Sequence, residues 1–145
     1  MIFAYFDTSA LIKRYVREKG SARVVSLLSR HDLLSSAITP VEVMSALCRR
    51  KRNGELSDKD FAATLGRVQD DRTQWELVEV GSAVLSGAEA VIQGRVPMRA
   101  LDAIHVASLV TFQAASGLTI PFVTGDDRQR VAAGHIGLDV VWVGG

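Results

Sequence analysis

Short apolar segments alternate with stretches long enough for helices along almost the whole chain, and this alternation constrains the fold more than any other feature. The predicted strands cover five segments: Ile2–Phe6, Asp32–Ser36, Leu77–Val80, Ile120–Thr124 and Val140–Val143. Strands separated by helix-length connections form parallel sheets with helices on both faces. We therefore expect an α/β fold with three layers, in which a central, mostly parallel sheet of about five strands is flanked by helices.

The segments between the strands carry helix boundary signals. In Thr39-Pro40-Val41-Glu42, a capping threonine, a proline at the first helical position and a glutamate at the third predict a helix that extends to about Arg52. The other predicted helices run from Ser9 to about Arg17, over Ala22–Ser29, from Ser57 to about Arg72, over Ala83–Gln93, from Arg99 to about Ala115 and over Asp127–Ala133.

Composition narrows the class of protein. A length of 145 residues fits a single domain over residues 1–145, and 48% hydrophobic with 23% charged residues is typical of a globular chain. The formal net charge of +1 argues against a protein held to nucleic acid by a general positive field. Cys48 is the only cysteine, which excludes an internal disulfide and a multi-cysteine zinc site. Since no apolar run reaches the ~20 residues of a membrane helix, we expect a cytoplasmic protein that does not bind membranes.

Four acidic residues follow predicted strands or begin the helices after them: Asp7, Glu42, Asp102 and Asp126. In parallel α/β sheets, ligands bind where the carboxyl ends of the strands meet the following loops. Each acid also has a purely structural explanation. Asp7 and Glu42 could cap helices, Asp102 could complement a helix dipole, and Asp126 could be a turn residue. Because four such residues share one edge of the predicted sheet, we expect them to form one pocket.

Clustered carboxylates are unfavourable unless something compensates their charge. Two unit charges about 4 Å apart repel each other by roughly 4 kcal/mol at an effective dielectric constant near 20. A whole domain is stable by only about 5–15 kcal/mol, so a shared proton or a bound cation must offset the repulsion. Oxygen ligands without cysteine favour Mg²⁺ or Mn²⁺. A divalent ion of this kind assists phosphodiester hydrolysis, which is the chemistry that the residues predict.

Four motifs carry a resemblance to a known family. Asp7–Lys13 after the first strand resembles the opening of PIN-domain nucleases, and Pro40–Val43 is similar to their second motif. Ala100–Ala107 and Val123–Asp126 are similar to the third and fourth motifs. Their order and spacing fit the PIN-like fold over essentially the whole chain. A free-standing domain of this length resembles the VapC-type toxins of toxin–antitoxin pairs.

The resemblance implies an Mg²⁺-dependent endoribonuclease, with Mn²⁺ able to substitute, that leaves a 5′-phosphate and a 3′-hydroxyl. It further implies a homodimer and inhibition by a small cognate antitoxin of the VapB type. Asp7 and Asp102 would bind the metal directly, and Glu42 and Asp126 directly or through water. Ser9 and Thr124 occupy the family's positions for small hydroxyl residues, where they would orient carboxylates or a water molecule.

Several residues near the acids are candidates for further roles. Lys13 and Arg14, in the predicted helix after Asp7, are the candidates for phosphate contact. The basic run Arg49–Arg52 either complements a helix dipole or contacts RNA or antitoxin. We expect Asp127 to begin a helix, and His105 to be a hydrogen-bonded packing residue rather than a general base.

Other functions remain open at this point. A PIN-like domain could bind RNA or protein without cutting, or could act as a housekeeping nuclease that has no antitoxin. A phosphatase of the haloacid-dehalogenase type also begins with a strand and an aspartate. It normally has a second acid two residues later, where this chain has Ser9.

Overall fold

A computed structural model describes residues 2–145, which form five strands, seven α-helices and one 3₁₀ turn. The strands are β1 (Ile2–Phe6), β2 (His31–Ser36), β3 (Glu76–Val78), β4 (Phe122–Thr124) and β5 (Val140–Trp142). The helical elements are α1 (Thr8–Leu11), η1 (Ile12–Arg14), α2 (Ser21–Arg30), α3 (Thr39–Arg52), α4 (Asp58–Arg72), α5 (Ser82–Ile92), α6 (Ala100–Ser116) and α7 (Asp127–His135).

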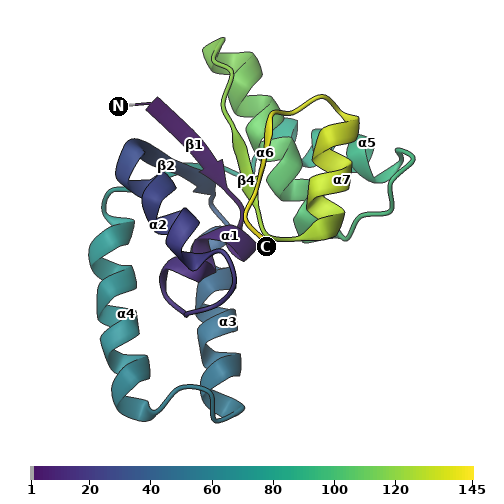
Figure 1. Ribbon diagram of the computed structural model, residues 1–145. Coiled ribbons are helices and arrows are strands. Elements are labelled where there is room, and N and C mark those ends of the chain that lie inside the picture. The colour runs from purple at the N-terminus through teal and green to yellow at the C-terminus, as the bar shows by residue number, and fades with distance from the viewer. Residues whose placement is uncertain (1) are drawn as a thin grey trace.

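The five strands form one parallel sheet in the order β3-β2-β1-β4-β5, with β1 at its centre (Figure 1). The chain moves from β1 through β2 to β3 on one side and then returns through β4 to β5 on the other. The strand order therefore reverses between β1 and β4, where Tyr5 pairs with Phe122 and Phe6 with Val123. In open parallel sheets the crevice at such a reversal, at the carboxyl ends of the strands, is the usual ligand site.

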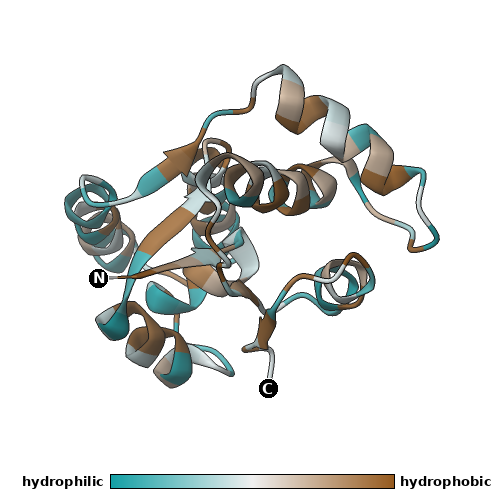
Figure 2. Ribbon diagram, turned by 90° about the horizontal axis from the view of Figure 1, so that it is seen from above, coloured by the Kyte–Doolittle hydropathy of each residue, from teal (hydrophilic) through white to brown (hydrophobic). Residues whose placement is uncertain are grey.

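Helices cover both faces of the sheet, which gives three layers. Helices α1 to α4 lie on one side and α5 to α7 on the other (Figure 1). Alternate residues of β1 point to these two sides, so Phe6 belongs to one core and Tyr5 to the other. Figure 2 shows apolar segments running through the strands between the helices. The predicted α/β fold class is confirmed, and none of the helices described is both long and apolar enough to cross a bilayer.

The prediction of one helix from Ser9 to about Arg17 is wrong. Only Thr8–Leu11 is α-helical, and the chain then tightens into the 3₁₀ turn of residues 12–14. The side chain of Lys13 turns inward, and Tyr15 donates a hydrogen bond to Asp71 on α4. These tertiary contacts take the chain out of the helical path that its apolar spacing favours.

The predicted capping box at the start of α3 is also wrong, although the helix itself is confirmed. Ile38 occupies the N-cap position without a side-chain hydrogen bond. The Thr39 hydroxyl lies 2.6 Å from the Ser35 hydroxyl, and the Glu42 carboxylate binds side chains of other elements. Glu42 is therefore free to serve another purpose than capping.

A glycine fixes the connection between the 3₁₀ turn and α2. Gly20 has a φ of +89°, and a Cβ atom there would lie 1.9 Å from the backbone oxygen of Val143. We expect Gly20→Ala to lower the melting temperature, because the left-handed backbone alone costs about 1–2 kcal/mol with a side chain and the Val143 backbone would have to move. The measurement is thermal unfolding.

Gly66→Ala is the matched control for this prediction. Gly66 lies inside α4 with no atom within 4 Å of a Cβ position, and alanine favours the helix by up to about 1 kcal/mol. The control should be at least as stable as the parent. Equal melting temperatures for the two variants would contradict the proposed constraint at Gly20.

Candidate functional site

The four acidic residues predicted from the sequence line one pocket of about 540 Å³. Asp7 follows β1, and Asp126 follows β4, so these two lie at the point where the strand order reverses. Glu42 comes from the first turn of α3 and Asp102 from the first turn of α6. Two strand ends and the first turns of two helices thus bring the four side chains to one place.

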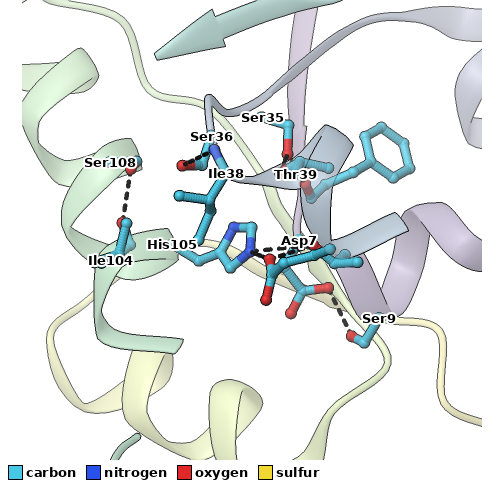
Figure 3. Close-up of polar contacts among 12 residues, drawn as sticks. Asp7, Ser9, Ser35, Ser36, Ile38, Thr39, Ile104, His105 and Ser108 are labelled. Carbon is cyan, nitrogen blue, oxygen red and sulfur yellow. Dashed lines mark hydrogen bonds and ion pairs between the residues drawn. The ribbon is translucent and has the colours of Figure 1, made fainter. Parts of the chain in front are cut away.

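Asp7 is the most deeply buried of the four, with 2% of its surface exposed. Its Oδ1 accepts hydrogen bonds from the Ser9 hydroxyl (2.6 Å) and the Ala10 backbone N–H (2.9 Å), and its Oδ2 accepts one from the Thr124 hydroxyl (2.5 Å). Burial raises the pKa of Asp7, while these donors and nearby His105 oppose the rise. Figure 3 shows Ser9 turned toward the Asp7 carboxylate. Asp7 is therefore held in one orientation before any ligand arrives.

Glu42 is anchored through one oxygen only. Its Oε1 accepts hydrogen bonds from the Thr8 hydroxyl (2.6 Å) and from His105 Nε2 (2.7 Å). Burial by itself would raise the pKa of Glu42, but His105 and Thr8 outweigh it and hold that pKa below its ordinary value. Among residues 2–145, no group donates to Oε2, which leaves that oxygen for a ligand in the pocket.

Asp126 and Asp102 differ in how they are supported. Asp126 caps α7, because its Oδ1 accepts hydrogen bonds from the backbone N–H groups of Arg128 (2.8 Å) and Gln129 (3.1 Å). Asp102 accepts no hydrogen bond from any group in the described part of the chain. Burial raises the pKa of Asp102, and repulsion by Asp126 and Asp7 adds to the rise. Asp102 is thus the carboxylate most in need of a cation.

The donor set fits a hard divalent cation that keeps most of its water ligands. Within residues 2–145, no three His, Cys, Asp or Glu side chains stand close enough to form a complete ligand cluster. Mg²⁺ needs only one or two carboxylates besides water, and the pocket offers unpaired oxygens on Glu42, Asp126 and Asp102. Gln129 lines the same pocket with 1% exposure. Neither the nitrogen nor the oxygen of its side-chain amide has a hydrogen-bond partner among the residues described. A buried amide without partners indicates a place for water or a ligand.

The supporting residues predicted from the sequence stand beside the acids. Ser9 and Thr124 both donate to Asp7, and the Ser9 hydroxyl also accepts a hydrogen bond from the Gly125 backbone N–H at 3.0 Å. His105 is buried and hydrogen-bonded, as expected of a packing residue. Asp127 is exposed in the first turn of α7 and pairs with Arg130, which agrees with a helix-start residue.

The structure does not bring Lys13 and Arg14 to the acidic pocket, so their expected phosphate contacts need correction. Lys13 is 8% exposed, and its Nζ binds Glu18 (2.9 Å) and the Lys19 backbone oxygen (2.7 Å). Arg14 pairs with Asp71 at 3.2 Å and lines a different pocket. The 3₁₀ turn rotates both side chains away from the positions that a regular helix would give them.

Three other arginines border the acids, and sequence reasoning missed two of them. Arg49 and Arg99 line the acidic pocket, and Arg99 and Arg128 line an adjoining hollow of about 350 Å³ that also contains Asp102 and Asp126. All three are exposed, and within the described residues none of them forms an ion pair. Arg49 belongs to the predicted basic run, whereas its neighbour Arg50 pairs with Glu18. Arg99 lies three residues before Asp102, and Arg128 lies two residues after Asp126. This short distance along the sequence from a candidate acid is the signal that could have identified them.

Comparison with known proteins agrees with this geometry. The model of the PIN-domain family matches residues 4–134. The chain is also 33% identical over 142 residues to the protein named Ribonuclease VapC46 from Mycobacterium tuberculosis (strain ATCC 25618 / H37Rv). That match covers 97% of this chain and 98% of the relative.

The crowded charge at Asp102 gives a stability prediction. We expect Asp102→Asn to raise the melting temperature of the chelator-treated protein at neutral pH, because asparagine is not repelled by Asp126 and Asp7. Folding raises the pKa of Asp102. Its ionisation therefore lowers the free energy of unfolding as the pH rises from the ordinary aspartate pKa through the higher pKa that Asp102 has in the folded protein. The gain should thus be complete above the folded pKa and absent in acid, below the ordinary aspartate pKa.

Asp127→Asn is the control for thermal unfolding across this pH range. Asp127 is the next acid along from Asp126 but is exposed and paired with Arg130, so its replacement should bring no gain. A lower melting temperature for Asp102→Asn at neutral pH, or an equal rise in the control, would count against charge crowding in the pocket.

Proposed function

This chain belongs to the PIN-domain family, and from this membership we propose that it is an endoribonuclease that hydrolyses RNA phosphodiester bonds as the toxin of a toxin–antitoxin pair. The observation that carries the proposal is the meeting of Asp7, Glu42, Asp102 and Asp126 in one pocket at the strand-order reversal. An assembly of like charges in a single pocket needs a compensating cation, and a phosphodiester is the substrate on which such a cation acts.

The metal in this proposal is Mg²⁺, with Mn²⁺ able to substitute. Nucleases of this family generally depend on divalent metal ions. Asp7 and Asp102 would hold the ion directly, and Glu42 and Asp126 directly or through water. When bound, the ion supplies positive charge beside the phosphate and lowers the pKa of a coordinated water.

The rest of the mechanism depends on how the chain holds these carboxylates. Ser9 and Thr124 keep Asp7 in one orientation, so it need not reorganise when substrate binds. Thr8 and His105 hold Glu42 Oε1 and leave Oε2 toward the pocket. Asp126 uses one oxygen as a helix cap and keeps the other available.

Arg49, Arg99 and Arg128 contact the phosphates of the RNA strand in this proposal, in place of Lys13 and Arg14. Acidic residues repel a polyanion, so a nuclease of this kind needs cations at the borders of its pocket. These arginines stand along two adjoining hollows that share Asp102 and Asp126, and within residues 2–145 no carboxylate pairs with them. A strand that passes through both hollows would meet a guanidinium group on each side of the acids.

A VapB-type antitoxin and a homodimer complete the proposal. The name VapC46 belongs to a ribonuclease of the same family that aligns with nearly the full length of this chain. Two other functions would leave different traces. A PIN-like domain that only binds would retain RNA affinity without cleavage, and a housekeeping nuclease would cleave RNA without stopping growth.

Replacing a pocket acid tests the nuclease directly. We expect Asp7→Asn and Asp102→Asn to reduce Mn²⁺-dependent RNA cleavage by at least 100-fold, since each removes a charge that the cation requires. The measurement is cleavage of total RNA with mapping of the product ends, which should carry 5′-phosphates and 3′-hydroxyls. Asp60→Asn, at an exposed position of α4 that lines neither hollow, should retain the parent's rate, and equal rates in all four proteins would refute the assignment of the acids.

The same variants separate a toxin from a housekeeping enzyme. Induced expression of the parent should arrest growth, whereas Asp7→Asn should not, and co-expression of an adjacent small gene should restore growth. Normal growth of cells that accumulate the active nuclease would contradict the toxin assignment while leaving the nuclease intact.

The position of Arg49 in the pocket predicts that its replacement changes the salt dependence of RNA binding. In an Asp7→Asn background that prevents cleavage, Arg49→Gln should weaken single-stranded RNA binding and reduce the slope of log affinity against log salt by about 0.7. Arg52→Gln is the matched control, because Arg52 is exposed on the same helix but does not line the pocket. Identical slopes for the two variants would show that Arg49 does not contact a phosphate.

A further inference from the structure

A buried chain of hydrogen bonds leads from the central strand to Glu42. The Tyr5 hydroxyl on β1 lies 2.8 Å from Nδ1 of His105 on α6, and Nε2 of the same ring lies 2.7 Å from Glu42 Oε1. Tyr5 is 0% exposed and His105 is 2% exposed. Figure 3 shows the His105 ring extending from α6 toward the carboxylates around Asp7.

The donor and acceptor properties of these groups determine how His105 contacts its neighbours. The carboxylate oxygen of Glu42 can only accept, so His105 must carry its hydrogen on Nε2. The buried Tyr5 hydroxyl lies 2.8 Å from His105 Nδ1, and a hydroxyl can donate to or accept from an imidazole nitrogen. The Tyr5 contact therefore fixes the orientation of the ring that presents an N–H group to Glu42.

We propose that Tyr5 and His105 are positioning residues that hold Glu42 Oε1 in place, so that Glu42 Oε2 faces the pocket as a ligand or as an acceptor for water. This inference rests on the proposed function, because it assigns a task to Glu42 in that pocket. Tyr5 and His105 themselves act through Glu42.

The chain of contacts links the elements that carry three of the acids. Tyr5 lies two residues before Asp7 on β1, and His105 lies three residues after Asp102 on α6. Glu42 is on α3, whose first turn lies across the pocket from α6. A shift of any one element would lengthen the 2.8 Å or the 2.7 Å contact, so the two bonds keep β1, α6 and α3 in register.

The Thr8 hydroxyl cannot replace Tyr5 and His105 in holding Glu42. It donates to the same Glu42 oxygen at 2.6 Å and lies 3.3 Å from His105 Nε2. A hydroxyl can rotate, whereas the imidazole ring is fixed by Tyr5 at its other nitrogen. The ring therefore determines the direction of Glu42, and the hydroxyl adds a second donor.

The test removes the Tyr5 hydroxyl and compares it with a matched tyrosine elsewhere. Tyr15 also donates to a carboxylate, that of Asp71, but it lines another pocket. We expect Tyr5→Phe to weaken Mn²⁺ binding to the RNA-free protein by about 10-fold, measured by titration calorimetry, and Tyr15→Phe to leave it unchanged. Circular dichroism verifies that both variants are folded.

A spectroscopic readout reports the two ring contacts themselves. In the parent, ¹⁵N NMR of the imidazole should show His105 protonated at Nε2, and Tyr5→Phe should shift the resonance of Nδ1. His105→Gln keeps a side-chain N–H group and should retain part of the Mn²⁺ affinity that His105→Leu loses. This conservative pair keeps the proposal testable if Tyr5→Phe does not fold.

Two results would overturn the inference. One is a parent in which His105 Nε2 carries no hydrogen, because the ring could then not donate to Glu42. The other is unchanged Mn²⁺ affinity in both Tyr5→Phe and His105→Leu. If the parent cleaves RNA and Glu42→Gln does not, either result refutes the positioning role alone. Failure of the parent to cleave would instead refute the proposed function.

Discussion

The burial of the Asp7 carboxylate is the interaction on which the rest of this structure depends. A carboxylate with 2% exposure at the end of the central strand is unfavourable unless several donors surround it. Three donors do so, two of them from α1 and the third from β4. Because Thr124 can reach Asp7 only if β4 lies beside β1, satisfying this one group also fixes the strand pairing at the reversal point.

The four acids divide structural and chemical tasks between their oxygens. Asp7 and Asp126 both cap helices, and Glu42 binds a hydroxyl and an imidazole through one oxygen. The structural explanations of these acids and the functional one are therefore not exclusive. Asp102 alone has no such support in the part of the chain described, and its raised pKa reflects burial and the neighbouring charges. The unfavourable charge is concentrated where a cation would relieve it most.

Local sequence patterns predicted much of the fold, because apolar runs and helix-boundary residues are clear signals wherever a segment is buried along its length. The strand Ile2–Phe6 is confirmed residue for residue, and the helix predicted to follow a Thr39 cap and end at about Arg52 covers Thr39–Arg52. The failures have a common cause. Lys13 and Tyr15 make contacts with Glu18 and Asp71, which no spacing rule includes, and these contacts replace a regular helix by a 3₁₀ turn.

The sequence by itself determined the alternation of strands and helices and the positions of the four acids along it. Those depend on apolar periodicity and on a residue's distance from the end of a strand. Only the tertiary structure decided which oxygen of each acid is free, which cations border the pocket and what His105 binds. Tyr5, Glu42 and His105 are separated by tens of residues, so their hydrogen bonds arise from packing across three elements. Direction and distance between such groups are properties of the folded chain, because no local pattern encodes them.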